Sequence, residues 1–125
     1  MVTIFYLQSD PSGHEALQVI SDRVEHMCGL VPKTRHIYIE GLYKEMLSGE
    51  EQPDFILVDN FFLCVEDWDV GGIPEIRKKF PDAIIVAKSV FEIKDKSLYD
   101  LVIGIDDDGK SLDFFCDQVA KKLTA

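Results

Sequence analysis

The stretch DFILVD, residues 54–59, gives the clearest structural signal in the chain. Four consecutive apolar residues, Phe55 to Val58, stand between two aspartates. A parallel strand covered on both faces of a sheet has this continuous apolar pattern, whereas a strand with one wet face alternates. The stretch therefore predicts a central parallel strand that ends at Asp59.

On both sides of this strand, apolar runs alternate with segments of helical spacing. Further strands are expected at Val2–Gln8, about Arg35–Ile39, Ala83–Ala87 and Leu101–Ile105. Helix faces are marked by Leu17, Ile20, Val24 and Met27, by Leu42, Tyr43, Met46 and Leu47, by Ile73, Ile76, Arg77 and Phe80, and by Leu112, Phe115, Val119 and Leu123. Only Ser89–Leu98 precedes the last strand, so the fourth helix should be short. The pattern indicates an α/β fold: a three-layer, doubly wound (βα)5 flavodoxin-like sheet, with five parallel strands in order 2-1-3-4-5.

The first helix carries start and stop signals in its sequence. Asp10 and Pro11 precede a capping box, Ser12 to Glu15, and Gly29 follows the last apolar position. Ser at the N-cap and Glu three residues later satisfy backbone N–H groups reciprocally, and glycine accepts the left-handed turn that ends a helix. Asp10 is itself a candidate N-cap.

Composition narrows the classes of function. The chain has 125 residues, of which 46% are hydrophobic, which suits one domain over residues 1–125. It carries 23 acidic and 13 basic side chains, a formal charge of -10, which opposes binding to nucleic acid or to anionic membranes. No segment is long and apolar enough to span a bilayer. Three widely spaced cysteines suggest a reducing, cytoplasmic location. Proteins and cations are the expected partners.

Residues 43–59, YKEMLSGEEQPDFILVD, resemble the helix, loop and strand that lead to the phosphoacceptor of response regulator receiver domains. Residues 73–86, IPEIRKKFPDAIIV, are similar to the next helix and strand of that family, and Ser9–Ser12 to its acidic first loop. The likeness covers essentially the whole chain. It implies a receiver-like domain of two-component signalling.

The resemblance also implies a site at the carboxyl ends of the strands. Asp59 matches the phosphoacceptor, and Asp10 matches a ligand of the Mg²⁺ that the reaction needs. The backbone carbonyl of Phe61 would complete the metal ligands. A divalent cation shared by two carboxylates neutralises the charge on a transferring phosphoryl group.

Three departures from the family pattern weaken this site. The first acid of the usual pair is Ser9, so only weak Mg²⁺ binding at Asp10 and Asp59 is expected. The expected hydroxyl at the end of the fourth strand matches Ala87, or Lys88 if the register slips by one, and Ser89 is out of register. Gly104 stands where the family has a lysine. Ala87, Lys88, Ser89 and Gly104 are thus the switch-region candidates.

Two acidic or aromatic segments adjoin the predicted site. The loop over residues 60–72 contains Phe61, Phe62, Leu63, Val65 and Trp68, and either packs onto the domain, which is slightly favoured, or presents a contact surface. Asp106, Asp107 and Asp108 fit a solvated helix start. Their charge would repel a phosphoryl group, which adds about -1.5 to -2 charges.

Three functions remain open. The favoured one is a degenerate receiver that acts through protein contacts without a phosphorylation switch, and is not an enzyme. The alternative is a working receiver that takes a phosphoryl group from a histidine kinase onto Asp59 and signals to a downstream protein. The third is a small flavodoxin-like enzyme or ligand-binding protein, which lacks support because no glycine-rich phosphate loop or nucleophile–base pair is found. No catalytic residue is assigned.

Overall fold

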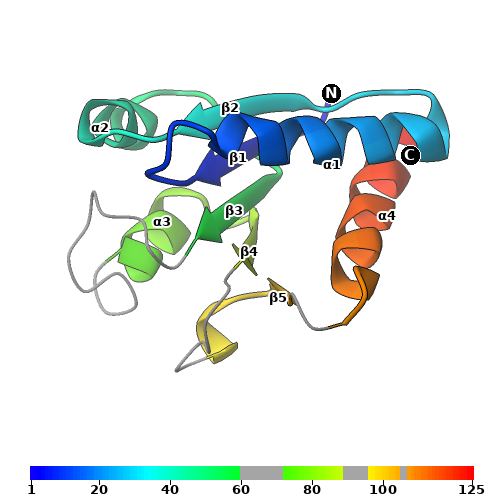
Figure 1. The fold of residues 1–125 in the computed structure, drawn as a ribbon. Coiled ribbons are helices and arrows are strands. Elements are labelled where there is room, and N and C mark those ends of the chain that lie inside the picture. The colour runs from blue at the N-terminus through cyan, green and yellow to red at the C-terminus, as the bar shows by residue number, and fades with distance from the viewer. Residues whose placement is uncertain (60–71, 89–95, 105–106) are drawn as a thin grey trace.

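The computed structural model describes residues 1–59, 72–88, 96–104 and 107–125, and its strands form one parallel sheet (Figure 1). The strand order is β2-β1-β3-β4-β5, as the sequence predicts. The expectations for residues 60–71, including Phe61, and for Ser89 and Asp106 fall outside the described residues. The strands are β1 (Thr3–Leu7), β2 (Lys33–Ile37), β3 (Phe55–Asp59), β4 (Ile84–Lys88) and β5 (Leu101–Ile103).

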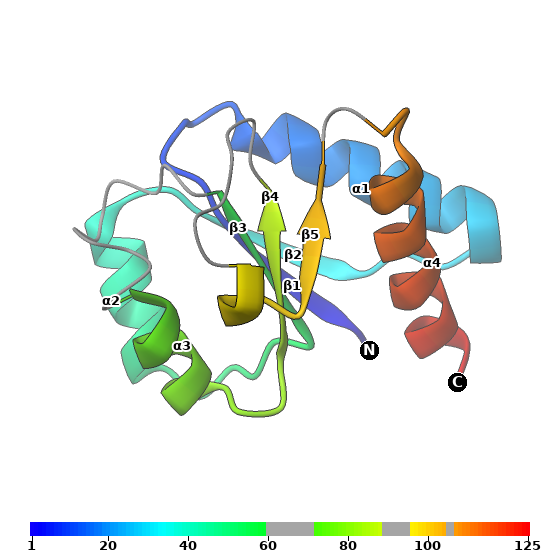
Figure 2. The same cartoon turned by 90° about the horizontal axis from the view of Figure 1, so that it is seen from below.

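Helices cover both faces of the sheet, so the three-layer prediction is confirmed (Figure 2). One hydrophobic cluster joins the sheet to α1 and α4, and a second joins it to α2 and α3. Cys116 of α4 is completely buried in the first cluster. A 3₁₀ helix, η2 (Lys96–Leu98), lies in the segment where a short fourth helix was expected. The helices are α1 (Gly13–Cys28), α2 (Glu40–Ser48), α3 (Ile73–Lys79) and α4 (Lys110–Thr124).

Strand β3 lies at the centre of this arrangement and serves both clusters. Phe55 and Leu57 pack toward α1 and α4, whereas Ile56 and Val58 pack toward α2 and α3. Burying each such side chain contributes about 1.5–3 kcal/mol relative to leaving it in water. The continuous apolar run is therefore required on both faces, and it holds Asp59 rigidly at the tip of the strand.

Two strands are displaced from their predicted positions. Strand β2 begins two residues early, at Lys33, because Thr3 of β1 pairs with that residue. Strand β4 runs from Ile84 to Lys88, one residue later than expected, and its last residue pairs with Asp59. Strand boundaries are set by the neighbouring strand, which local sequence does not show. The second shift brings Lys88 into the sheet beside the candidate site.

The first helix begins differently from its prediction. Ser12 is the N-cap, but its side chain makes no capping hydrogen bond, and its backbone is helical (φ -74°, ψ -3°) instead of extended. The capping box is therefore wrong in this respect. Instead, Oδ1 of Asp10 accepts a hydrogen bond from Ser12 N–H at 3.0 Å. Gly29 ends the helix in the left-handed conformation, as predicted.

The C-terminal end of helix α1 extends beyond the hydrophobic core. Leu17, Ile20 and Val24 are buried as expected, but Met27 is 44% exposed. The buried face of the helix stops at Val24, so the prediction that Met27 belongs to that face is wrong. Among the described helices, none is both long and apolar enough to cross a membrane.

Candidate functional site

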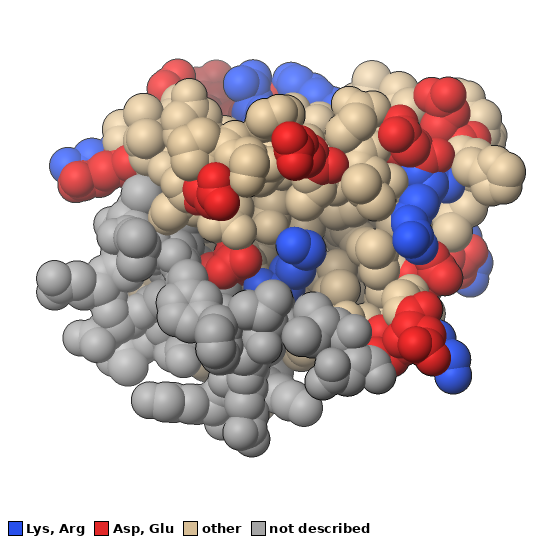
Figure 3. Space-filling model, viewed as in Figure 1, with Lys and Arg blue, Asp and Glu red and all other residues tan. Residues whose placement is uncertain are grey.

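The carboxyl ends of β1, β3 and β4 meet at one edge of the sheet. Asp59 is the last residue of β3, and it pairs in register with Lys88, the last residue of β4. Gln8 follows β1 directly, and β1 lies beside β3 in the sheet. Figure 3 shows acidic and basic side chains close together in this region, between α1 and the undescribed residues. The structure thus brings opposite charges to the predicted position of the site.

The Asp59 carboxylate accepts a hydrogen bond from an amide side chain. Gln8 Nε2 donates a hydrogen bond to Asp59 Oδ2 at 2.9 Å. The other atom of the same amide, Oε1, accepts a hydrogen bond from Asp10 N–H at 3.1 Å. Gln8 is therefore fixed at both ends, and it presents a donor to the carboxylate at a place where a metal ion would need an acceptor.

Tyr6 comes two residues before Gln8 and lies on the same face of the sheet. Its hydroxyl and its ring both contact the ammonium group of Lys88. Lys88 Nζ donates to Tyr6 Oη at 3.2 Å and also lies 5.5 Å from the centroid of the Tyr6 ring. Gln8 Nε2 is 3.5 Å from the same hydroxyl. Since Tyr6 is only 1% exposed, its hydroxyl is positioned by packing and links the cation to the amide.

His36 of β2 closes the cluster on the other side of β1. Its ring stacks on Tyr6 with the centroids 5.8 Å apart, and its Nε2 lies 2.9 Å from the carbonyl oxygen of Gln8. A carbonyl oxygen only accepts, so Nε2 carries the proton. Burial lowers the pKa of His36; the hydrogen bond to Gln8 opposes this shift, and His14 adds to it. We call Tyr6, Gln8, His36, Asp59 and Lys88 the Asp59 cluster.

Asp10 lies in the loop after β1, where its carboxylate accepts a hydrogen bond from the backbone of Ser12. The hydrogen bond from Ser12 N–H holds the pKa of Asp10 below its ordinary value. No group of three His, Cys, Asp or Glu side chains that could hold a metal ion occurs within residues 1–59, 72–88, 96–104 and 107–125. The side chains of these residues therefore show no assembled three-ligand metal site.

The end of β5 is occupied by the start of α4. Gly104 N–H donates to Ser111 Oγ at 2.8 Å, and Ser111 N–H donates to Asp107 Oδ2 at 3.2 Å. Hydrogen bonding with Ser111 keeps the pKa of Asp107 low. No cation stands at Gly104, where the family lysine would be, and the described cation of this edge comes from Lys88 on the neighbouring strand.

The remaining candidates separate into two groups. Ala87 is 1% exposed and packs in the α2 and α3 cluster, so it points away from the face that carries Tyr6. Ser89 and Phe61 lie outside the described residues. The roles predicted for Asp59, Asp10 and Gly104 concern chemistry that the geometry does not test, and they stay predictions.

Sequence reasoning missed most of the Asp59 cluster. It assigned no site role to Tyr6, Gln8 or His36, which were expected only as parts of the first two strands. A signal was present, because residues two apart in a strand share a face, which puts Tyr6 beneath Gln8. Their partners on β3 and β4 are distant in sequence, so no local pattern reveals them.

Comparison with known proteins supports the fold through structure alone, since neither a family model nor a curated protein matches the sequence. A signal receiver domain of a DNA-binding response regulator from Colwellia psychrerythraea has TM-score 0.69 and 14% identity, covering 97% of this chain and 99% of its own. A phosphorylated cyanobacterial phytochrome response regulator, RcpA, has TM-score 0.65 and 15% identity, with coverage of 96% and 91%.

A third similar structure comes from Burkholderia pseudomallei. It is a response regulator with a phosphorylated aspartic acid, a calcium ion and citrate, at TM-score 0.64 and 12% identity, covering 99% of this chain and 71% of its own. At identities this low, the likeness establishes the fold. The chain has the flavodoxin-like fold of response regulator receiver domains, so the resemblance seen in the sequence is confirmed at that level.

Proposed function

We propose that this chain is a receiver-like signal-transduction domain of the two-component type that acts through protein contacts, without a phosphorylation switch at Asp59. The proposal takes residues 1–125 as one domain, located in the cytoplasm, with no catalytic activity of its own. Its partners are a histidine kinase or a downstream signalling protein. The observation that carries it is the hydrogen bond from Gln8 to the Asp59 carboxylate.

This hydrogen bond opposes both steps of phosphorylation. A carboxylate oxygen that accepts from Gln8 Nε2 has one fewer lone pair for a metal ion or for attack on phosphorus. Gln8 Oε1 itself accepts from Asp10 N–H, so turning the amide away from Asp59 breaks a second hydrogen bond. A charge-assisted hydrogen bond of this kind is worth about 1.5–3 kcal/mol, which disfavours the open carboxylate.

The charge around Asp59 points the same way. Gly104 supplies no cation at the end of β5, and Lys88 is turned to the Tyr6 hydroxyl. Weak Mg²⁺ binding at Asp10 and Asp59 is retained in the proposal, because two carboxylates follow adjacent strands. A third carboxylate to hold the metal ion and the family lysine at the position of Gly104 are both missing. An acyl phosphate on Asp59 would therefore lack most of its usual positive counter-charge.

The alternative is a working phosphoacceptor. The P–N bond of a kinase phosphohistidine would break as a P–O bond to Asp59 forms, and Lys88 would leave Tyr6 to neutralise the new charge. The position of Lys88 opposite Asp59 in the sheet is the specific observation in its favour. Only a functional test separates this alternative from the degenerate receiver.

The test is exposure of the full chain to Mg²⁺ with beryllofluoride or phosphoramidate, followed by intact mass and backbone NMR. Wild type, Asp59→Asn and Asp82→Asn are compared, the last being an exposed aspartate before β4. We expect no covalent adduct and no Asp59-dependent shift across the sheet at millimolar Mg²⁺. An adduct present in wild type and Asp82→Asn but absent in Asp59→Asn would establish the alternative.

A gain-of-function variant sharpens a negative result. In Gln8→Asp/Gly104→Lys the amide that occupies Asp59 becomes an acid, and the missing lysine is restored. A Cβ fits at residue 104, since it would lie 3.6 Å from Asp107 Oδ2, an ordinary contact. A beryllofluoride response in this variant alone would show that these two positions disable the site.

A further inference from the structure

Strand β2 forms an edge of the described sheet, and exposed apolar residues flank it. The chain enters β2 through Leu30 and Val31 and leaves it through Tyr38 and Ile39, which are 38–50% exposed. These are four of the eight large apolar side chains that are exposed in the described residues. An exposed edge bordered by apolar side chains is a common docking site for another extended chain.

The backbone of β2 shows which groups face outward. Lys33 N–H donates to Val2, and the carbonyl of Ile37 accepts from Gln8, so odd-numbered residues bond to β1. The N–H and C=O groups of a strand residue point to the same side and reverse at the next residue. Thr34 and His36 therefore turn their backbone N–H and C=O groups away from the sheet.

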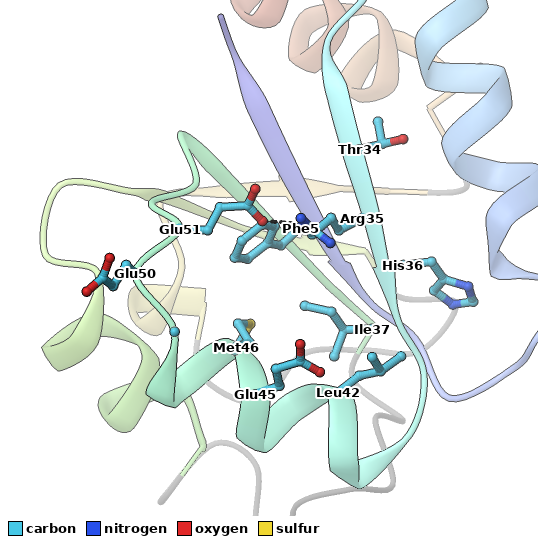
Figure 4. A pocket seen from close by; sticks show the side chains of 11 residues that line it. Phe5, Thr34, Arg35, His36, Ile37, Leu42, Glu45, Met46, Glu50 and Glu51 are labelled. Atoms are coloured by element: carbon cyan, nitrogen blue, oxygen red, sulfur yellow. Dashed lines mark ion pairs between the residues drawn. The ribbon is translucent and has the colours of Figure 1, made fainter.

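A pocket of about 360 Å³ opens beside this edge, between β2, α2 and the segment after α2. Its apolar lining comes from Phe5, Ile37, Leu42 and Met46. Figure 4 shows Leu42 and Glu45 projecting from α2 toward β2, with Thr34 and His36 on the other side of the strand from Arg35. The volume suits one or two apolar side chains of an added strand.

The charges around the pocket are unequally paired. Glu51 binds both Lys33 and Arg35, with its contact to Lys33 at 2.5 Å. Glu45 and Glu50 also line the pocket but form no ion pair with any described residue. Two cations of the edge thus share one carboxylate, which leaves the strand with net positive charge, while Glu45 and Glu50 remain available to a basic side chain.

A second copy of this chain is a poor occupant. Pairing β2 with β2 antiparallel about a twofold axis through Arg35 sets the two Arg35 side chains opposite each other. Like charges directly opposite across a strand pair are destabilising, and Lys or Arg on an edge strand discourages self-association. The observed charges fit a different partner.

We propose that the β2 edge and the adjoining pocket bind an extended segment of a partner protein, which adds a strand beside Thr34 and His36. One apolar side chain of the segment fills the pocket, and a neighbouring Lys or Arg pairs with Glu45, which projects toward β2. The surface shares His36 with the Asp59 cluster but does not include the Asp59 carboxylate. It extends the proposed interaction role without needing phosphorylation, so the experiments on the two sites fail independently.

The probe is a random nonapeptide display library selected against the full wild-type chain. Enriched peptides are synthesised and titrated against wild type, Thr34→Pro, Thr34→Ala and Glu45→Gln. Proline removes an outward N–H and fixes φ, which edge strands tolerate, whereas alanine removes the threonine side chain but keeps the N–H. We expect alternating apolar peptides with Lys or Arg, at least tenfold weaker binding to Thr34→Pro, no more than twofold change for Thr34→Ala, and weaker binding to Glu45→Gln.

Hydrogen exchange provides a measure that needs no variant. A bound peptide should slow exchange of the Thr34 and His36 amides in wild type. Failure to enrich any peptide, or equal affinity for wild type and a folded Thr34→Pro, would overturn the proposal. So would unchanged exchange at both amides on saturation with peptide. Wild-type dimers that dissociate on Thr34→Pro substitution would assign the edge to a second copy instead.

Discussion

The Asp59 cluster and the β2 edge treat their polar groups in opposite ways. At the Asp59 cluster, carboxylate, amide, hydroxyl and ammonium bind one another. At the β2 edge, the backbone of Thr34 and His36 faces outward, and Glu45 has no described ion-pair partner. The polar groups of the Asp59 cluster are hydrogen-bonded to one another, whereas the polar backbone groups of Thr34 and His36 face away from the sheet.

This contrast shows that the position of a residue in a fold and the contacts of its side chain can be set independently. Asp59 remains at the tip of the central strand because β3 is required by both hydrophobic layers. The neighbours of Asp59 are not held by that requirement: Gln8 donates a hydrogen bond to its carboxylate, and Gly104 supplies no cation at the end of β5. Fold and site chemistry are under separate constraints, so function has to be argued from the site.

The largest expected effect tests the assignment of inward and outward groups on β2. Arg35→Pro removes an N–H on the β1 side and should lower the free energy of unfolding by about 1–3 kcal/mol. Thr34→Pro should change it by less than about 1 kcal/mol, because its N–H faces outward. Urea unfolding of both variants measures the difference. Equal losses would show that β2 does not alternate as described.

A smaller effect tests the link within the Asp59 cluster. Tyr6→Phe removes the hydroxyl that accepts from Lys88, and should lower the free energy of unfolding by about 0.5–1.5 kcal/mol. Tyr38→Phe is the matched control, since that ring is 38% exposed and should change stability by less than about 0.5 kcal/mol. The same urea measurement applies, and indistinguishable variants would remove the hydroxyl from the cluster.

The smallest effect is a pH dependence from His36. Burial lowers the pKa of His36 below 6.5, so below that pH the unfolded chain binds more protons than the folded one. Stability is therefore full above about pH 6.5 and declines as pH falls from there through the lowered pKa. His36→Gln should flatten this decline in thermal unfolding, while exposed His26→Gln should keep it. A decline that survives in His36→Gln would assign it to other groups.

The sequence predicted the fold well because apolar periodicity records which faces are buried. Phe55 to Val58 indicated a central strand, and the strand order follows the receiver-like arrangement. The details of the site were less accessible. Whether Lys88 ends β4 depends on its pairing with Asp59, and the role of Gln8 depends on a hydrogen bond across 51 positions of sequence. Non-local contacts of this kind leave no local pattern.

Because Cys116 is completely buried, its chemical modification can be used to detect local unfolding of α4. Burial raises the pKa of this thiol to about 11, so almost none of it is thiolate near neutral pH, and alkylating reagents have no access in the folded state. Modification must wait for α4 to leave the sheet. The labelling rate of Cys116, followed by peptide mapping, therefore measures how often α4 detaches from the sheet under native conditions.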